Sequence, residues 1–348
     1  MPNISGKAAK QIIKGALLKE NVEPQAAEYV AEGLTSTSLR GVDSHGIRLI
    51  HHYLAGVKSG RINPRPVYRV EKKLPTTALL DADNTFGHAA GQEAVKIAME
   101  MAAEYGSGQV AIKNSTHFGA AAYFALEIAS HDMIGTSYTH SDSLIIPTNG
   151  KRSYLGNNPV CFAAPVKGEG PFCLDMATSI ITFNAVRRLR EMGEAAPENV
   201  GTDKDGIPTT DPNEITMLLP VGSYKGYGLS LMVEILCSML TGMNYGSHIS
   251  KMFENIDQKR HLGHFISATN ISGFQEIDTF KERLAGLLNE LRSEPPLNAE
   301  QGVMVAGDPE KKKYLSRGQD GIPLTDNEFQ QFRDLNQDYQ LDVEIDCG

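Results

Sequence analysis

The sequence predicts a protein of the α/β class with two lobes. From about residue 76 onward, short apolar strands alternate with helices, which is the pattern of a sheet covered by helices. The chain has 348 residues, more than a single hydrophobic core usually absorbs. Its 41% hydrophobic and 22% charged residues are typical of a globular protein.

The first 60 residues are predicted to be helical. Ser5 is placed to cap a first helix, whose apolar stripe runs from Ala8 to Leu17. Pro24 stands near the first position of a second helix, where its missing N–H group is tolerated. A third helix is expected over residues 47–58, with Ser44 as its N-cap.

The middle of the chain is predicted to supply the sheet and the helices that cover it. Short apolar runs bounded by turn residues indicate strands, and longer amphipathic runs indicate helices. Helices are expected over residues 92–105, 119–130, 227–240 and 278–291. Strands are expected over residues 78–81, 109–112, 134–138, 160–164, 171–174, 263–268 and 302–305.

Proline clusters mark the expected lobe boundaries. Residues 63–66 contain two X-Pro pairs and residues 294–296 end in Pro-Pro, and both segments interrupt regular structure. We therefore expect a helical lobe made of residues 1–75 and 293–348, and a sheet lobe made of residues 76–292. The acidic tail from Asp334 to Asp346 is expected to be a solvated extension.

The charge of the chain excludes some partners. The formal net charge is −9, and the longest basic run is the three lysines at 311–313, so no basic stripe for nucleic acid is present. The first residues lack the apolar core of a signal peptide, and the most apolar stretch, 229–240, is too short to span a membrane and contains Glu234. We expect a cytoplasmic protein with no nucleic-acid or membrane partner.

The cysteines and histidines do not form a recognisable metal motif. No CxxC pair occurs among the four cysteines, and Cys161, Cys173 and Cys237 lie in apolar runs, as reduced core thiols do. Cys347, second from the end, is wrongly placed for prenylation. The histidine spacings match no metal site, so we expect no bound metal.

The glycine pattern excludes the usual dinucleotide fingerprint. The sequence contains no GxGxxG, and the GxG pairs at 106–108 and 168–170 lack the third glycine and the strand-turn-helix frame. We expect both pairs to be turns. A nicotinamide enzyme with this sequence would have to hold its cofactor in a fold other than the Rossmann fold.

Residues 43–48 form the first candidate site. Ser44, His45 and Arg48 would lie near one helix start, with Tyr53 more than a turn later. An arginine there could hold a carboxylate by a bidentate pair. The segment alone is equally compatible with an ordinary capped helix that exposes Arg48.

Residues 114–119 form the second candidate site. They follow a predicted strand and precede a predicted helix, and α/β proteins commonly place their sites at such strand ends. A helix N-terminus beside His117 would lower the pKa of its imidazole and offer N–H groups to an anion. A histidine that is merely hydrogen-bonded in a loop remains the alternative.

Three further segments could contact a nucleotide. Asp175 ends a predicted strand, where its carboxylate could accept from ribose hydroxyls, and a simple helix cap is the alternative. Lys225 and Gly226 stand at a helix start and could seat a phosphate, although Walker spacing is absent. Residues 306–310 form a turn that could face a nucleotide or nothing.

Together these segments resemble a known family, because seven motifs occur in the same order along nearly the whole chain. The resemblance is to the type-2 malate/L-lactate dehydrogenase family, and residues 202–212 with the helix from residue 225 look most like ureidoglycolate dehydrogenases. The motifs are Asp-Ser-His-Gly at 43–46, Asn-Ser-Thr-His-Phe-Gly at 114–119, Leu-Gly-Asn-Asn-Pro at 155–159, Leu-Asp-Met-Ala-Thr-Ser at 174–179, Lys-Gly-Tyr-Gly at 225–228, Gly-His-Phe at 263–265 and Gly-Asp-Pro-Glu at 307–310.

The resemblance implies a fold and an activity. The fold is a mixed-sheet, nucleotide-binding lobe of the sulfolactate dehydrogenase type, unlike the Rossmann fold, with a helical lobe built from both chain ends. The activity is hydride transfer between NAD, or possibly NADP, and a small anionic 2-hydroxy or 2-keto acid of the malate, lactate or ureidoglycolate type. The family works as homodimers or assemblies of dimers.

The resemblance also implies roles for individual residues. His117 is the proton acceptor in a ureidoglycolate-type enzyme, whereas His45, with Ser44 beside it, is the proton donor in imine-reducing members. Arg48 holds the substrate carboxylate, and we also expect Tyr53 and His264 to contact the substrate. The residues expected at the cofactor are Ser141, Asp175, Met176, Ala177, Lys225, Gly226, Gly307, Asp308, Pro309 and Glu310.

Two alternatives stay open. One is a cyclic imino-acid reductase of the same fold, but imine-reducing relatives carry an acidic residue about ten positions after the aspartate of the Asp-Met-Ala motif, and residues 182–186 contain none. Many relatives also have glycine where Asn184 stands. The other is a non-catalytic ligand-binding relative, against which the presence of His45, Arg48 and His117 argues.

Overall fold

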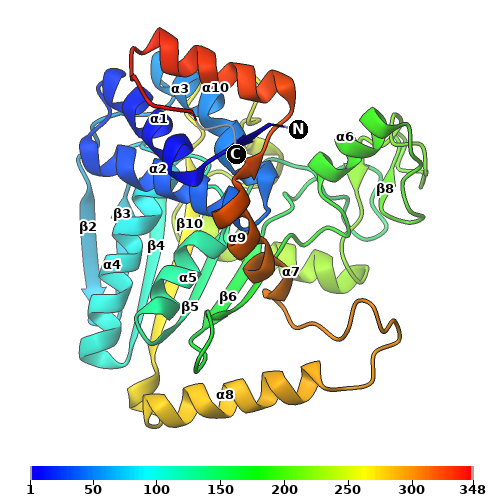
Figure 1. Cartoon of the computed structure of the whole chain (residues 1–348). Coiled ribbons are helices and arrows are strands. Elements are labelled where there is room, and N and C mark those ends of the chain that lie inside the picture. Colours follow the sequence, from blue (N-terminus) through cyan, green and yellow to red (C-terminus); the bar gives the residue numbers. More distant parts are fainter. Residues whose placement is uncertain (1, 346–348) are drawn as a thin grey trace.

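The structure is a computed structural model that describes residues 2–345 (Figure 1). One part is helical and the other contains the sheet, and the N-terminal helices lie at one end of the strands. Asp346 and Cys347, named above in the acidic tail and among the cysteines, lie outside the described residues.

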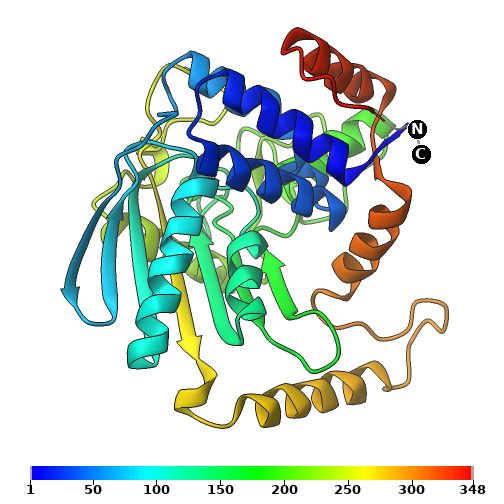
Figure 2. The ribbon, with the colours of Figure 1, turned by 60° about the vertical axis from the view of Figure 1, so that its left-hand side comes forward.

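Both chain ends build the helical lobe. Its helices are α1 (Gly6–Lys19), α2 (Pro24–Leu39), α3 (Ile50–Lys58) and α10 (Asp326–Asp338). The first two begin as predicted: the Ser5 hydroxyl accepts a hydrogen bond from the Ala8 N–H at 3.1 Å, and Pro24 opens α2. Strand β1 (Asn3–Ile4) pairs antiparallel with β11 (Ile322–Pro323), which joins the two ends, as Figure 2 shows.

The acidic tail is not the solvated extension that we predicted. Thr325 and Glu328 form a capping box at the start of α10. Within the tail, Leu335 is buried, and Tyr339, Leu341, Val343 and Ile345 pack on the core of the helical lobe, while Asp334 and Asp338 are exposed. Phe329 and Phe332, earlier in the same helix, are buried in that core as well. The high charge of the segment therefore led us to overlook its apolar stripe, which packs on the helical lobe.

The sheet is mixed, as expected from the resemblance. Its seven strands lie in the order β2-β3-β4-β10-β5-β6-β7, and only the pair β3–β4 is parallel. This order differs from a Rossmann sheet, whose strands are mostly parallel. The strands are β2 (Arg69–Leu74), β3 (Thr77–Asp81), β4 (Ser107–Ser115), β5 (Met133–Thr139), β6 (Val160–Ala164), β7 (Phe172–Met176) and β10 (Leu262–Asn270).

Two details of the sheet differ from the predictions. Strand β2 pairs with β3, so the chain enters the sheet at residue 69, and a lobe boundary at residue 75 would separate these partners. The strand predicted at 302–305 is wrong, because this segment has no regular structure and lies outside the sheet. Its apolar residues made it resemble a strand, but it forms no ladder with any strand of the described residues.

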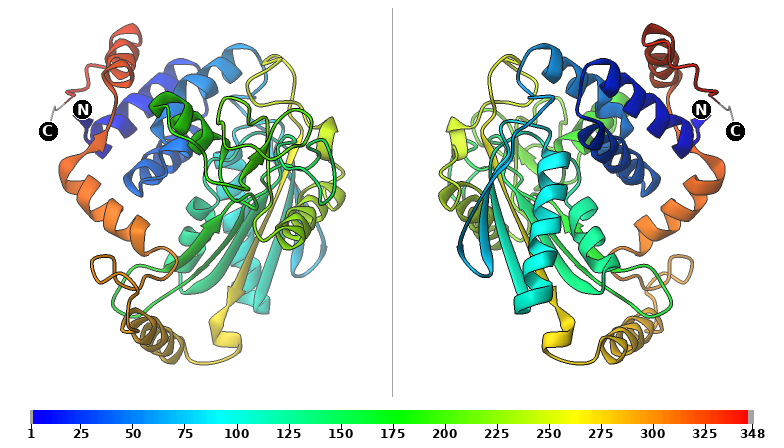
Figure 3. Two further views of the ribbon diagram at one scale, coloured as in Figure 1. Left: turned by 90° about the vertical axis from the view of Figure 1, so that its right-hand side faces the viewer. Right: turned by 90° about the vertical axis from the view of Figure 1, so that its left-hand side faces the viewer.

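Helices cover both faces of the sheet (Figure 3). On one face lie α4 (Gly87–Tyr105) and α5 (Ala122–Ser130), which bury an apolar core against β4, β5 and β10. On the other face lies α7 (Tyr224–Glu234), which continues as a π-helical turn (Ile235–Met239). Cys161, Cys173 and Cys237 are free and buried in these cores, as predicted. No helix within residues 2–345 has the length and apolar character needed to cross a membrane.

The remaining elements form a small subdomain and an arm. The subdomain contains α6 (Phe183–Met192), β8 (Gly201–Thr202) and β9 (Met217–Leu218) around its own small core. The arm consists of α8 (Ile277–Arg292) and α9 (Asp308–Asp320), and it returns the chain to the helical lobe (Figure 1). Short 3₁₀ turns occur at Asp43–His45, Ile47–Leu49, Gly246–His248 and Ile271–Gly273.

Candidate active site

A cleft of about 1270 Å³ separates the helical lobe from the sheet lobe. Its walls come from α2, the 3₁₀ turn at Asp43–His45, the ends of β4 and β7, the start of α9 and the loop at 249–261. The volume exceeds the roughly 300–1,000 Å³ of pockets that enclose drug-sized ligands, so a dinucleotide and a small acid fit together. The predicted residues that line it are Ser44, His45, His117, Ser141, Asp175, Ala177, Gly307, Pro309 and Glu310.

His117 lies just beyond the end of β4 and is held by the helical lobe. Its Nδ1 atom is 2.7 Å from the hydroxyl of Tyr53, which is fully buried in α3. Because Tyr53 occupies Nδ1 and does not itself line the cleft, Nε2 is the imidazole nitrogen left for a ligand. Tyr53 therefore orients His117 and does not reach the cleft as we had predicted.

His45 stacks beside His117, with ring centroids 5.5 Å apart. Burial, and then the neighbouring His45 and His88, lower the pKa of His117 well below its usual value. Burial also lowers the pKa of His45. Two stacked imidazoles are difficult to charge together, so both rings are neutral at pH 7 and can accept a proton.

Ser44 does not cap a helix, contrary to the prediction. Its hydroxyl lies 2.8 Å from Nδ1 of His45, and the backbone around it forms two successive 3₁₀ turns before α3. The Ile47 N–H donates instead to the Ser38 hydroxyl of α2, at 3.0 Å. Gly46 makes this contact possible, because a Cβ atom there would overlap the Ser38 hydroxyl.

Arg48 lies outside the cleft. Its Nε atom is 2.9 Å from a carboxylate oxygen of Glu328 in α10, and the side chain is exposed. Extended Gly46 separates the 3₁₀ turn of His45 from that of Arg48, so the two side chains do not share the face of one continuous helix as we had predicted. Of the capped-helix alternative, the exposure of Arg48 is confirmed, but the cap is not, because neither 3₁₀ turn nor α3 has an N-cap side-chain hydrogen bond.

His264 is also not a cleft residue. It is fully buried in β10, with Nδ1 2.8 Å from the Thr139 hydroxyl and Nε2 2.8 Å from the Ser115 hydroxyl. Burial, together with nearby His140, lowers its pKa to about 3, so the ring is neutral. It stacks on Phe118 and ties β4 to β5, which supports the backbone on which His117 stands.

Arg260 is the cation that the sequence analysis missed. It lines the cleft with only 2% of its surface exposed, and its Nη2 donates to Asp142 at 2.6 Å and its Nε to the Ser250 carbonyl at 3.0 Å. Among the residues that the structure describes, its Nη1 has no hydrogen-bond partner. Its position directly before β10 and the Gly-His-Phe motif was the signal available in the sequence.

The loop that carries Arg260 is held by a second buried arginine. The Arg61 guanidinium donates to four carbonyl oxygens of this loop, at 2.6–3.0 Å, which closes the loop around it. Four carbonyl partners satisfy a buried cation without a carboxylate. The acceptors belong to Met252, Glu254, Asn255 and Gln258.

Asp175 forms the opposite wall of the cleft, at the end of β7. Its Oδ2 accepts from the Ala122 N–H at 3.0 Å and so caps α5, while the side chain stays open to the cleft. Desolvation by the surrounding protein raises its pKa to about 6, against the lowering effect of the Ala122 N–H and Arg40. The second carboxylate oxygen is free to accept from a ribose hydroxyl.

Gly307 lies on the cleft wall and packs on the backbone of β7. It has a φ of 93°, and a Cβ atom there would lie 3.1 Å from the backbone oxygen of Cys173. The backbone of β7 and the start of α9 thus approach more closely than a side chain would permit. Gly307 is buried, so this close approach packs α9 on β7. Asp175 and Glu310 are the groups on this wall that could accept from ribose hydroxyls, so the residues fit a dinucleotide.

Four residues expected at the cofactor do not line the cleft. Asp308 turns away to bind Arg292, which also binds Glu169, and this cluster ties the arm to the sheet lobe. Met176 pairs with Val160 in the sheet. Lys225 is exposed at the start of α7, and Gly226 packs against Val221, where a Cβ atom would overlap the carbonyl oxygen.

Ser141 lines the cleft and explains the Leu-Gly-Asn-Asn-Pro motif. Its N–H donates to Asn158 Oδ1 and its hydroxyl to Asn157 Oδ1, both at 3.0 Å. Gly156 has no room for a Cβ atom, which would lie 2.3 Å from the Ser141 hydroxyl. The motif is therefore a support for the segment that follows β5.

Comparison with known proteins agrees with this geometry. The family model for malate/L-lactate dehydrogenase matches residues 4–333. A malate dehydrogenase of Pyrococcus abyssi is 37% identical, with 88% of this chain and 87% of the relative covered, and an NAD(+) ureidoglycolate dehydrogenase of Escherichia coli is 32% identical, with 94% of each covered. The solved sulfolactate dehydrogenase of Methanocaldococcus jannaschii superimposes with a TM-score of 0.91 at 31% identity, over 98% of each chain. The chain belongs to the malate/L-lactate dehydrogenase family.

Proposed function

We propose that this protein oxidises a small anionic 2-hydroxy acid, or reduces the matching 2-keto acid, with His117 as the acid–base residue. The observation that carries the proposal is the neutral His117, fixed by Tyr53 through Nδ1 with Nε2 left for a ligand in a cleft that holds a buried cation. NAD or NADP, when bound, accepts or supplies the hydride at C2 of the acid.

The proton chemistry follows from the two nitrogens of His117. In the oxidation direction, Nε2 takes the proton of the substrate hydroxyl, and Nδ1–H donates to the Tyr53 oxygen. In the reduction direction the same proton returns to the substrate oxygen. His45, whose Nδ1 faces the Ser44 hydroxyl, stacks on one side and keeps water away from that ring face.

The carboxylate of the substrate pairs with Arg260 in this proposal, in place of Arg48. Arg260 is buried and its Nη1 has no partner among the described residues, whereas Arg48 is exposed and already paired with Glu328. Asp142 holds the guanidinium in place and leaves one edge free for an anion. A buried charge-assisted pair of this kind binds more tightly than a surface pair.

The cofactor in this proposal is NAD. Asp175 and Glu310 line the same wall of the cleft, and carboxylates there would accept from ribose hydroxyls but repel a 2′-phosphate. Among the described cations that line the cleft, Arg40 is the one that acts on Asp175, and it could favour NADP instead. Two acids against one arginine favour the unphosphorylated nucleotide.

The exposed apolar surface of α7 and of the π-helical turn after it supports assembly into a homodimer. Large apolar side chains exposed together on one helix usually mark a protein interface. The sequence predicted a strongly apolar helix here, and the structure leaves much of it uncovered by this chain. The exposed residues are Leu229, Leu231, Met232, Ile235, Met239 and Leu240. Sedimentation equilibrium should give twice the chain mass of 37.9 kDa, and Ile235→Glu should reduce it to one chain.

The imino-acid reductase alternative is less well supported. Thr182, Phe183 and Asn184 line the cleft at the place where imine-reducing relatives carry an acidic residue, and none of them can partner a protonated histidine. Reduction of piperideine-2-carboxylate by NADPH, at a rate above that of every 2-keto acid, would establish this alternative.

The test is a substrate panel with a matched mutant. NADH and NADPH oxidation is measured against 2-keto acids, and NAD reduction against malate, lactate, sulfolactate and ureidoglycolate, for the wild type and His117→Ala. We expect one acid to be turned over, with a loss in the mutant of roughly 10²–10⁴-fold, the usual contribution of general acid–base catalysis. Absence of nicotinamide binding in the wild type would refute the proposal.

A further inference from the structure

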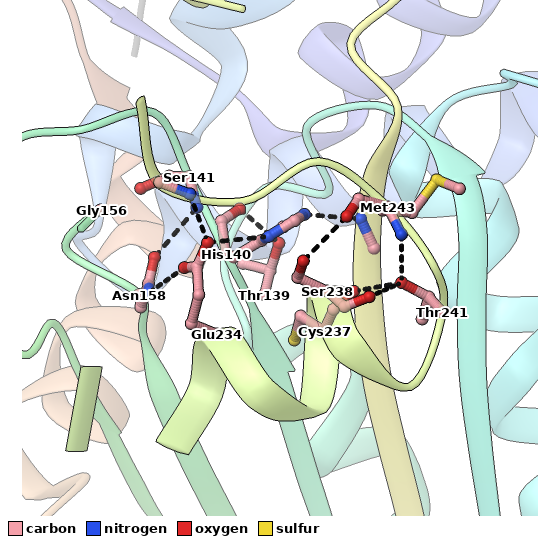
Figure 4. Close-up of polar contacts among 12 residues, drawn as sticks. Thr139, His140, Ser141, Gly156, Asn158, Glu234, Cys237, Ser238, Thr241 and Met243 are labelled. Carbon is pink, nitrogen blue, oxygen red and sulfur yellow. Dashed lines mark hydrogen bonds and ion pairs between the residues drawn. The ribbon is translucent and has the colours of Figure 1, made fainter. Parts of the chain in front are cut away.

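A buried polar network lies under the floor of the cleft, centred on Glu234 (Figure 4). Glu234 is the last residue of α7 and is 3% exposed. Its Oε2 accepts from the Asn158 amide at 2.8 Å, and its Oε1 accepts from the Gly246 N–H at 2.7 Å. The acid–base chemistry described above does not use this carboxylate, yet burying an ion is costly unless its bonds are well matched.

The first connection from Glu234 to the cleft runs through Asn158. The Asn158 amide nitrogen donates to Glu234 and to the Ser230 carbonyl, so its oxygen is turned toward the Ser141 N–H, which it accepts at 3.0 Å. The bond to Glu234 thereby fixes the orientation of the amide in which its oxygen, and not its nitrogen, meets the Ser141 N–H. Ser141 is followed by Asp142, the residue that holds Arg260.

The second connection runs through His140. Its Nε2 accepts from the Gly263 N–H at 2.8 Å, so Nδ1 is the ring nitrogen that carries a proton. That Nδ1 is buried without a hydrogen-bond partner among the described residues, and the nearest carboxylate oxygen is Oε1 of Glu234 at 3.7 Å. Glu234 thus adds an electrostatic attraction that favours the same tautomer and holds the ring in place.

The π-helical turn after Glu234 provides the room for this arrangement. Gly263 of β10 packs so closely on the turn that a Cβ atom would overlap the Cys237 carbonyl, which accepts from the Thr241 hydroxyl. Burial alone would raise the pKa of Glu234, but the nearby His140 ring and the hydrogen bonds from Gly246 and Asn158 outweigh this and lower it. The carboxylate is therefore ionised at neutral pH. π-Turns of this kind occur frequently at functional sites.

We propose that Glu234 is a positioning residue, which fixes the Thr139–Asp142 floor of the cleft through Asn158 and His140. It touches neither substrate nor cofactor, and it acts on Ser141 at the cofactor and on the Asp142–Arg260 pair at the substrate. Which ligand the floor meets rests on the proposed function, but the network itself does not.

Glu234→Gln tests the proposal with one changed atom. Two donors, the Gly246 N–H and the His140 Nδ1–H, face the Oε1 position, so the glutamine oxygen takes that place. The new NH₂ group then faces the Asn158 NH₂ group, and two donors repel each other. Asn158 must move or turn, and either change removes the acceptor of the Ser141 N–H. The size of the protein core is unchanged.

The matched control is Ser238→Ala. Ser238 is buried in the same π-helical turn and donates to the Met243 carbonyl at 2.9 Å, but it does not touch Glu234, His140 or Asn158. Both variants should lower the melting temperature, so stability alone does not distinguish them.

The measurements are NMR-detected amide exchange in the unliganded protein and fluorescence titration with NADH and NADPH. In Glu234→Gln we expect exchange of the Ser141 amide to accelerate, and the Kd of the preferred nucleotide to rise, each about tenfold, the scale of one lost charge-assisted hydrogen bond. The KM for this nucleotide should rise together with its Kd, while kcat changes less. Ser238→Ala should leave all of these within twofold of the wild type.

Two outcomes would overturn the positioning role. One is unchanged Ser141 exchange and nucleotide affinity in Glu234→Gln despite a lower melting temperature. The other is an equal effect of Ser238→Ala on both measurements. If the wild type binds neither NADH nor NADPH, the proposed function fails, and the Ser141 exchange rate by itself still decides whether Glu234 holds the floor.

Discussion

The hydroxyl of Tyr53 lies 2.7 Å from Nδ1 of His117 and joins the two lobes at the cleft. Tyr53 belongs to α3 of the helical lobe, and His117 follows β4 of the sheet lobe. Because the tyrosine is fully buried, the position of one lobe sets the direction of the imidazole on the other. A change in how the lobes pack would therefore alter the acid–base residue directly.

Tyr53→Phe should lower kcat with little change in substrate KM. The ring still packs against Phe86 and His88, but Nδ1 of His117 loses its partner, so the imidazole can rotate and adopt the wrong tautomer. We expect a loss of roughly tenfold in kcat, as for one hydrogen bond of about 1.4 kcal/mol. Steady-state kinetics check this, with melting temperature as the folding control. An unchanged kcat would show that His117 needs no such support.

The pH profile of hydroxy-acid oxidation should extend into the acidic range. Oxidation requires neutral His117, and because its pKa lies well below the usual value of 6.5, the residue stays neutral as the pH falls past 6.5. Loss of kcat/KM therefore begins only at lower pH, as protons reach the lowered pKa. Measuring kcat/KM from pH 4.5 to 8 checks this. A half-maximal point at or above 6.5 would contradict it.

Arg260→Lys and Arg48→Gln should separate the two candidate carboxylate partners. Arg260→Lys keeps a charge but loses the planar fork, so we expect KM for the acid to rise by roughly tenfold or more. Arg48→Gln breaks the Glu328 ion pair and the hydrogen bond to the Pro323 carbonyl, both at the surface, so it should leave KM unchanged and cost about 1 kcal/mol of stability. The reverse ranking would return the anchoring role to Arg48.

Asp175→Asn should weaken the preference for NAD over NADP. Asparagine keeps an acceptor for the Ala122 N–H but removes the charge that would repel a 2′-phosphate. We expect the NADP-to-NAD ratio of kcat/KM to rise by about tenfold, one unit of 1.4 kcal/mol. Asp175→Ala, which also removes the cap of α5, is the control for loss of local structure. No change in the ratio would place the adenosine ribose elsewhere.

The same substitution should change the pH dependence of stability. The pKa of Asp175 is raised to about 6, so between pH 4 and pH 6 the folded protein keeps a proton that the unfolded chain has released. Stability therefore falls as the pH rises through this range. In the unliganded protein, Asp175→Asn should melt higher than the wild type at pH 8 and at nearly the same temperature at pH 4. Thermal denaturation at both values checks this.

Much of the fold could be predicted from the sequence. The cap at Ser5, the helix start at Pro24 and the alternation of strands and helices depend on neighbours in the chain, so local patterns specified them correctly. The strand at 302–305 and the solvated tail were wrong, since a strand needs a partner and α10 needs the lobe that it packs on. Neither partner is adjacent in the sequence.

The candidate site was predicted in part. His45, His117, Ser141 and Asp175 line the cleft. His117 and Asp175 stand at strand ends that the local pattern located, whereas Ser141 was expected from the resemblance alone. The direction of a side chain after an irregular turn was not predictable, and for this reason Arg48 and Asp308 point away from the cleft.

The sequence by itself determined the family, the fold class and part of the lining of the cleft, because ordered motifs and periodicity are properties of the chain. Only the tertiary structure decided which cation faces the substrate, which hydroxyl orients His117, and that Glu234 lies beneath Ser141. Arg260 and Asp142 are 118 residues apart, and Glu234 and Asn158 are 76 apart. Contacts at such separations arise when strands β5 and β10 pair and α7 packs on them, and the local sequence carries no record of that pairing.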